Sequence, residues 1–157
     1  MINTNAKTAL CKLLRQGLVP KRLQSVFEEE GIIVFDEGVC GRLVTKNVDG
    51  PGKRYRCRSE WFCGFLVVTR LHVVCYTFRK RQINISVNDN KIKNLYVCRA
   101  NIQELHLSFE SSDYRDGWQG VIEFRFYTEK ALQFCDALLG IGVKKVTAPG
   151  RDVANTS

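Results

Sequence analysis

The chain has 157 residues, 45% of them hydrophobic, and its 24 lysines and arginines against 16 acidic residues give a net charge of +8. A chain of this length is typical of one domain that buries enough surface to fold without a metal ion or disulfides. No apolar run approaches the roughly 20 residues of a membrane-spanning helix, and residues 1–14 lack the order of a secretory signal. The positive charge favours an anionic partner, namely nucleic acid, an anionic lipid surface or an acidic protein.

The cysteines predict the compartment and argue against a metal. Seven cysteines, at positions 11, 40, 57, 63, 75, 98 and 135, are scattered without C-x-x-C pairs. This pattern fits a reducing compartment in which each thiol acts as a small core residue, so we expect a cytoplasmic protein. Structural zinc usually takes two ligand pairs with ligands two to four residues apart. We therefore expect neither a metal nor any other cofactor.

Residues 1–31 are expected to form an N-terminal helical extension with two short helices. The first has an apolar stripe at Leu10, Leu13 and Leu14, and ends at Gly17. The second begins at Pro20, which suits a first helical turn, and ends at Gly31.

The second helix has charges opposed to its dipole. Lys21 and Arg22 stand at its positive end and Glu28–Glu30 at its negative end. Its apolar face, which carries Leu23, Val26 and Phe27, must therefore stabilise it by packing, and we expect it to dock on the body of the protein.

From Ile32 onward the pattern is that of strands. The two most apolar segments, Phe65–Thr69 and Leu71–Tyr76, are separated by a single residue, which predicts a tight hairpin or one bulged strand. About seven or eight short strands at regular spacing are typical of a barrel or a sandwich. The apolar or alternating segments are 32–35, 39–45, 53–58, 65–69, 71–76, 83–87, 95–98, 105–109 and 122–126.

A helix is expected at Thr128–Leu139, with Thr128 as its cap. Its apolar face is expected to comprise Leu132, Cys135, Leu138 and Leu139, with Ala131 and Phe134 at the edges, before Gly140 and Gly142 end it. Residues 32–142 then form the main domain, and residues 143–157, rich in small and polar residues, form a tail expected to be disordered.

The segment Gly64–Tyr76, GFLVVTRLHVVCY, resembles the core hairpin of bacterial pleckstrin-homology-like (PH-like) and GRAM-like domains, where a G-x-L-x-x-T-x-x-R-L-hydrophobic pattern often appears. His72 stands where an arginine or a hydrophobic residue is common. With the order of elements, the resemblance covers Ile32 to Leu139. It implies a mainly β fold, a PH-like β-barrel of about seven strands closed by the C-terminal helix. It also implies a binding module for lipids or proteins that lacks enzymatic activity, and some members self-assemble through exposed strands.

No catalytic pattern stands out. Of the two histidines, His72 lies in the most apolar hairpin and His106 alternates with Leu105 and Leu107, so structural or surface roles are expected for both. The glycine-rich segments Asp49–Gly52 and Gly140–Gly142 lack the G-x-x-x-x-G-K-[ST] pattern and indicate turns. We expect no enzyme.

Two basic clusters are the best candidates for a site. The first flanks the expected turn Asn47–Gly52, and the second stands at a later connection. Alternation places Arg54, Arg56 and Arg58 on one face of a strand and Tyr55 and Cys57 on the other. The anion- or partner-binding candidates are Lys46, Lys53, Arg54, Arg56, Arg58, Arg79, Lys80 and Arg81.

These clusters allow several interpretations. They could be a solvated basic edge that discourages aggregation between strands. In a PH-like barrel, the first cluster resembles the position at which lipid-binding members hold phosphates. Nucleic acid would in addition need exposed aromatic rings, for which Tyr55, Trp61 and Trp118 are the candidates.

The sequence therefore favours a non-enzymatic binding or scaffolding module. Its expected partner is another protein, or a second copy in self-assembly. The alternative is peripheral binding of an anionic membrane lipid or of nucleic acid through the basic residues. Binding to phosphates would weaken steeply with salt, whereas an apolar protein contact would survive it.

Overall fold

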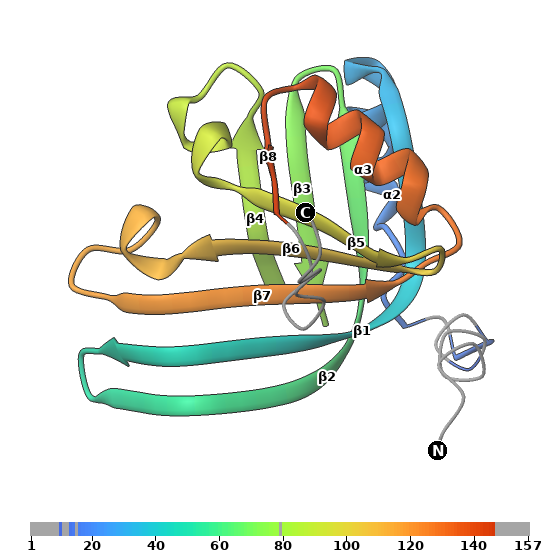
Figure 1. Cartoon of the computed structure of the whole chain (residues 1–157). Helices are drawn as coiled ribbons and strands as arrows, with labels where there is room; N and C mark the ends of the chain where they lie inside the picture. Colours follow the sequence, from blue (N-terminus) through green and yellow to red (C-terminus); the bar gives the residue numbers. More distant parts are fainter. Residues whose placement is uncertain (1–9, 11–12, 15, 79, 147–157) are drawn as a thin grey trace, which may run out of the picture.

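The computed structural model describes residues 10, 13–14, 16–78 and 80–146. Over this range the protein is mainly β, with one eight-stranded sheet in the order β4-β3-β2-β1-β7-β6-β5-β8, curled into a half-barrel (Figure 1). Every pairing is antiparallel except that of β5 with β8. The strands are β1 (Ile32–Gly50), β2 (Lys53–Thr69), β3 (His72–Thr77), β4 (Lys80–Ser86), β5 (Tyr96–Asn101), β6 (Glu104–Glu110), β7 (Gln119–Tyr127) and β8 (Lys144–Lys145).

β1 and β2 are long and bent, and each joins segments that the sequence divided. β1 unites 32–35 with 39–45, and β2 unites 53–58 with 65–69. Register shifts between Asp36 and Val39, beside Gly38 at φ 63°, let β1 bend without ending. The expected turn over Asn47–Gly52 is likewise shorter, because β1 continues to Gly50 and only Pro51–Gly52 form the turn.

The expected barrel of about seven strands closed by a helix is wrong in strand number and in closure. The described sheet has eight strands, and its two ends, β4 and β8, do not pair with each other. The alternation of apolar and polar residues along a strand shows which side of the strand is buried. Closure of a barrel depends instead on whether the first and last strands of the sheet pair, and this alternation does not encode that pairing. The last strand, β8, follows the buried Val143 and lies in the stretch that the sequence assigned to a disordered tail.

Helix α3 (Ala131–Gly140) lies across the concave side of the sheet and contacts β1, β2, β5 and β6. Its buried face consists of Ala131, Phe134, Cys135 and Leu138, whereas Leu132 is 51% exposed. The expected face was therefore wrong at Leu132. The helix begins at Ala131 rather than at Thr128, whose hydroxyl donates to the Asp36 carboxylate of β1 and accepts from the backbone N–H of Lys130.

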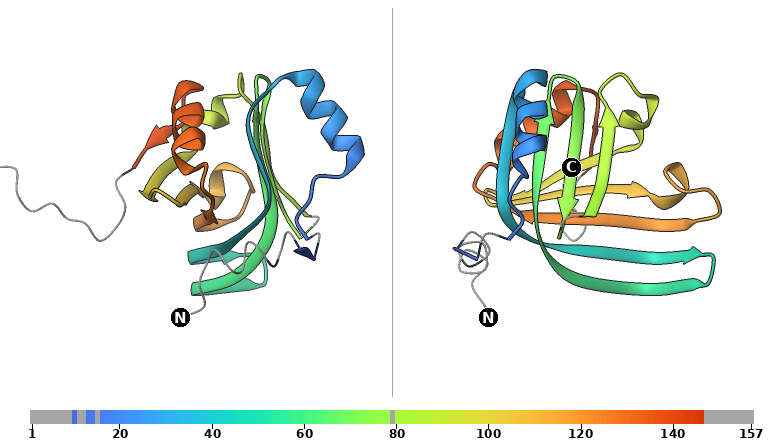
Figure 2. Two further views of the ribbon diagram at one scale, coloured as in Figure 1. Left: turned by 90° about the vertical axis from the view of Figure 1, so that its right-hand side faces the viewer. Right: turned by 180° about the vertical axis from the view of Figure 1, so that it is seen from behind.

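Helix α2 (Lys21–Glu30) packs on the opposite, convex side of the sheet (Figure 2). Its start after Pro20 and its end at Gly31 confirm the predicted limits. Phe27 is buried against Phe65, with ring centroids 6.3 Å apart, in a cluster with Val67 and Val74. β2 is thus covered on both faces, and the predicted docking of this helix is confirmed. The first expected helix lies mostly outside the described residues.

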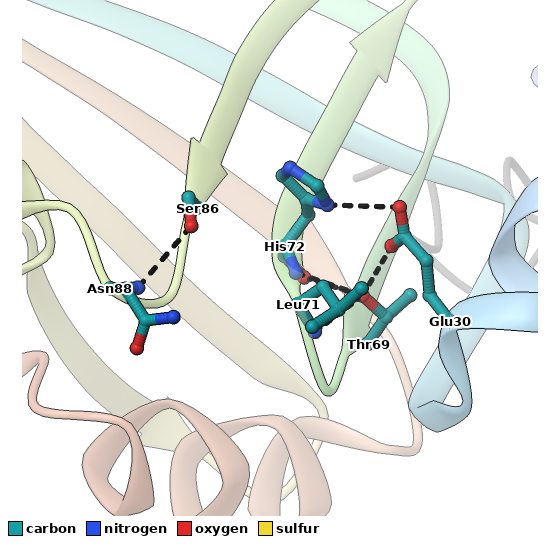
Figure 3. Close-up of polar contacts among 6 residues, drawn as sticks. All are labelled: Glu30, Thr69, Leu71, His72, Ser86 and Asn88. Atoms are coloured by element: carbon teal, nitrogen blue, oxygen red, sulfur yellow. Dashed lines mark hydrogen bonds and ion pairs between the residues drawn. The ribbon is translucent and has the colours of Figure 1, made fainter.

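A polar contact fastens the end of α2 to the β2–β3 turn (Figure 3). The Thr69 hydroxyl donates to Glu30 over 2.7 Å and accepts from the backbone N–H groups of Leu71 and His72. Glu30 also pairs with His72 Nδ1 at 2.9 Å. These contacts give an acidic side chain at the unfavourable end of the helix dipole a tertiary role that offsets its local cost.

The main core fills the space between the sheet and α3. Its largest enclosed side chains include Phe124, Phe126, Phe134 and Leu138. Cys75, Cys98 and Cys135 are buried free thiols and Cys57 is an exposed one, but Cys63 is disulfide-bonded. The cysteines therefore do not by themselves assign a reducing compartment. No helix of the described residues is long and apolar enough to cross a membrane.

Candidate functional site

The first basic cluster lies on the end of the β1–β2 hairpin, which runs beside β7 on the side of the molecule away from α3 (Figure 1). Arg54 pairs with Asp49 at 3.1 Å and Arg58 pairs with Glu60, both in exposed positions. Lys46, Lys53 and Arg56 form no ion pair with any described residue. Residues 46–60 carry five basic side chains against two acidic ones, so the hairpin has a net positive charge.

The second cluster begins β4, an edge strand. Lys80 and Arg81 are exposed there, and Arg79 lies outside the described residues. The next residue, Gln82, lines the same cavity as Lys53 and Arg58 of the hairpin. This cavity of about 230 Å³, which we call the hairpin pocket, is thus lined by Lys53 and Arg58 of the first cluster but by neither Lys80 nor Arg81 of the second.

The floor of the hairpin pocket follows from strand alternation. Thr45 is the direct cross-strand neighbour of Arg58 on one side and of Ile122 on the other, and Ile122 is that of Phe109. Directly paired residues share a face of the sheet. The next row along the same face is Glu60, Leu43 and Phe124, and these residues also line the pocket.

The walls come from the hairpin tip and from the loop after β6, which holds the 3-10 turn η2 (Ser111–Asp113). Tyr114 packs on Phe109 with ring centroids 4.5 Å apart, and its hydroxyl donates to the Lys91 carbonyl. Trp118 lies so close to Gly50 that a Cβ there would collide with the indole ring. The hairpin and the loop therefore enclose the pocket from two sides.

The polar lining residues of the pocket comprise three cations, one acid and three neutral side chains: Lys53, Arg58, Arg115, Glu60, Thr45, Gln82 and Ser111. Arg115 lies over the Trp118 ring, with its guanidinium carbon 5.7 Å from the ring centroid, and it forms no ion pair within the described residues. Lys53 adds a second such cation, whereas Glu60 is occupied by Arg58. The hydroxyls of Thr45 and Ser111 are buried and have no hydrogen-bond partner among the residues that the structure describes. The pocket therefore has an apolar floor, aromatic walls and a positively charged rim, which together suit a ligand with an apolar part and an anionic part.

The histidines lie elsewhere. His72 belongs to the contact with Glu30. His106 is buried beside Glu104, with Nε2 2.6 Å from the carboxylate, and its Nδ1 is 3.9 Å from Glu123. Neither histidine lines the pocket, and within the described range no group of three or more His, Cys, Asp or Glu side chains could hold a metal ion.

The two tryptophans lie in different parts of the structure. Trp61 is 42% exposed on the face opposite the pocket floor, where it contacts Tyr127 and lies under Arg42. Trp118 lines the pocket. Only Trp118 therefore combines an aromatic ring with the predicted basic residues at one place.

Sequence reasoning missed several members of the pocket: Thr45, Gln82, Ser111, Tyr114 and Arg115. They come from different strands and from a loop that the sequence marked only as a connection. Burial raises the pKa of Tyr114, as it would for a ring enclosed by a packed loop. A packed aromatic within a polar loop is the one signal that could have suggested its role.

A larger hollow of about 820 Å³ lies beside the start of α2, next to Phe65 and Tyr76. It borders Leu14 and Gln16, whose neighbours at 11, 12 and 15 lie outside the described residues, so no site is argued from it.

Comparison with protein-family models gives no match, and comparison with curated proteins gives no similar chain.

Proposed function

We propose that this protein is a non-enzymatic binding module that docks an acidic segment of another protein on its β1–β2 hairpin and hairpin pocket. The observation that carries the proposal is the convergence of cations from two separate elements, β2 and the loop after η2. Lys53, Arg58 and Arg115 line one apolar cavity, and Arg56, two residues from Arg58 on β2, adds a further exposed cation. Charges of one sign gathered around a concave surface steer and hold a partner of the opposite sign.

An acidic protein segment fits this surface better than a bare polyanion. The pocket floor, with Phe109, Ile122 and Phe124, offers apolar contact that a phosphate backbone would not use. Interfaces between proteins combine such an apolar centre with a charged rim. Arg and aromatic side chains at the centre are the residues that most often dominate binding energy.

The sheet edges favour a partner other than a second copy. β4 carries Lys80 and Arg81, and β8 at the other edge consists of Lys144 and Lys145. Positive side chains on edge strands oppose pairing between identical edges. If the protein self-assembles as a scaffold, we propose that its copies meet through surfaces other than these two edge strands.

Membership of the bacterial PH-like group is also part of the proposal. In its support, a series of antiparallel strands precedes one helix, and α3 packs by an apolar face on the concave side of the sheet. An open sheet of eight strands departs from the expected seven-stranded barrel. Binding modules with this arrangement need no catalytic residues, which agrees with the proposed function.

The alternative is peripheral binding of anionic lipid or nucleic acid, favoured by the exposed cations at the hairpin tip, such as Arg54 and Arg56. It differs in its dependence on salt, because contacts to many phosphates release counterions and weaken steeply.

The proposal is tested by reversing the hairpin charge. The K53E/R56E double variant should bind a fluorescent acidic peptide with one aromatic residue at least about tenfold more weakly than the wild-type chain. The matched control is K93E/R99E, which reverses two exposed charges outside the pocket and should stay close to wild type. Fluorescence anisotropy measures the affinities.

Equal affinity for both variants would overturn the proposed site. Parallel titrations with anionic vesicles and single-stranded RNA decide the alternative, since tighter binding to either one would replace the protein partner. Light scattering at low and high salt on the same samples detects a dimer, and a dimer that persists at high salt would make a second copy the partner.

A further inference from the structure

Two buried hydroxyl groups on the hairpin pocket lack hydrogen-bond partners within the described residues. Ser111 is fully buried, at 0% exposure, and its hydroxyl plays no part in the turn η2, whose hydrogen bonds use its carbonyl. The Thr45 hydroxyl is the second such group. Buried polar groups without partners are rare in folded proteins, and each one calls for a physical explanation.

Thr45 and Ser111 both line the pocket, and a rotation of either enclosed hydroxyl toward the cavity would let a bound group accept its hydrogen bond. The nearby cations Lys53 and Arg115, which form no ion pair with a described residue, would favour an acceptor that carries negative charge. Hydrogen bonds to a charged acceptor are stronger than those between neutral groups. The polar part of the pocket therefore suits an anion.

The size of the pocket and its aromatic residues favour a small anion that carries an apolar group. The cavity, about 230 Å³, is below the usual size of a site for a drug-sized ligand and fits a fragment or one side chain. Phe109, Phe124 and Trp118 offer apolar contact. Glu60 also lines the pocket and, although paired with Arg58, would repel a doubly charged phosphate more than a singly charged carboxylate.

We infer that the hairpin pocket binds a carboxylate carried on a compact apolar or aromatic group. The inference deepens the proposed function and rests on it for the source of that carboxylate. The source is the C-terminal residue of an acidic partner protein or a free organic acid. Both offer the same chemistry, with oxygens toward Thr45 and Ser111 and an apolar body against the aromatic walls.

The probe for the test is phenylacetate, observed by saturation-transfer NMR with the full chain. Phenylacetamide has the same shape without the charge and should bind about tenfold more weakly, and phenyl phosphate should bind no better than phenylacetate. The T45V/S111A double variant should lose about tenfold in affinity for phenylacetate. S112A, which removes an exposed hydroxyl from the neighbouring position, is the matched control and should bind normally.

A second measurement separates binding from folding. Because the Ser111 hydroxyl has no hydrogen-bond partner among the described residues, S111A should unfold in urea at the same midpoint as wild type or a higher one. A clearly lower midpoint would mean that this hydroxyl stabilises the fold, and would overturn the inference. The inference is also overturned if phenylacetate fails to bind, if phenylacetamide binds equally well, or if phenyl phosphate binds more tightly.

The source of the carboxylate is decided by an acidic peptide with a free or an amidated C-terminus. Weaker binding of the amidated peptide supports the C-terminal residue, and equal binding together with bound phenylacetate supports a free acid. If the peptide binds through the hairpin but phenylacetate does not, only this inference fails. If phenylacetate binds but no acidic peptide does, the proposed function fails and the pocket remains a site for a free acid.

Discussion

At the scale of single residues, burial sets the chemistry of the thiols. Cys75 on β3 is completely enclosed by the main core. Burial raises the pKa of its thiol well above the ordinary value of 9.0, because the charged thiolate would lose its hydration. Burial raises the pKa of Cys98 and Cys135 in the same direction. These thiols stay protonated in the folded protein and act as small apolar side chains.

This predicts a loss of stability at alkaline pH. A thiol whose folded-state pKa is raised ionises first in the unfolded chain, so it contributes full stability below the ordinary pKa and loses it as pH rises above that value. For Cys75 the loss is about 1.4 kcal/mol per pH unit above 9.0. Urea unfolding at a series of pH values should show this slope in wild type and a shallower one in C75V. Identical slopes would contradict the account of Cys75.

Single residues also show what sequence reasoning could reach. Local signals were sufficient for α2, since Pro20 and Gly31 mark its two ends. Leu132 was misassigned because helical period alone does not say how wide a stripe the sheet covers, and only the face from Ala131 to Leu138 is enclosed. Thr45 and Ser111 could not be found, because their common pocket depends on pairing between strands far apart in the chain.

At the scale of elements, β2 holds the molecule together because both of its faces are covered. Leu66 and Val68 face the main core, whereas Phe65 and Val67 face α2. The close spacing of two apolar segments predicted either a tight hairpin or one bulged strand, and the structure has the hairpin of β2 and β3. It did not predict that β1 and β2 continue through their bends, because Gly38 and Gly64 resemble strand ends. In the structure Gly64 instead lets the strands approach closely, since a Cβ there would collide with the Tyr76 carbonyl.

The docking of α2 predicts a difference between two neighbouring positions. Phe27 is 4% exposed, and F27A should lower the free energy of unfolding by about 3 kcal/mol through lost burial and a cavity. Val26 is 44% exposed, and V26A should change it by less than about 0.5 kcal/mol. Chemical denaturation of the full chain measures both. Equally small effects would show that α2 does not depend on this contact.

At the scale of the whole molecule, the part of the sheet covered by the two helices and the β1–β2 hairpin have different roles. α3 fills the concave side with apolar side chains and α2 covers the convex side, so these parts serve stability (Figure 2). The β1–β2 hairpin extends away from both helices (Figure 1). Two of its cations, Lys53 and Arg58, meet Arg115 of the loop after η2 at the hairpin pocket. The positive charge seen in composition acquires a location only through the fold, which is why the sequence left its partner open.

The most direct test of the central claim is to locate an acidic peptide on the full chain by two-dimensional ¹H–¹⁵N NMR. The largest shifts on titration should occur at the Trp118 indole N–H and the backbone of Lys53–Arg58, with little change at Trp61 on the opposite face. Shifts concentrated on α2 or on the face of Trp61, or no shifts at all, would contradict the hairpin pocket as the binding site.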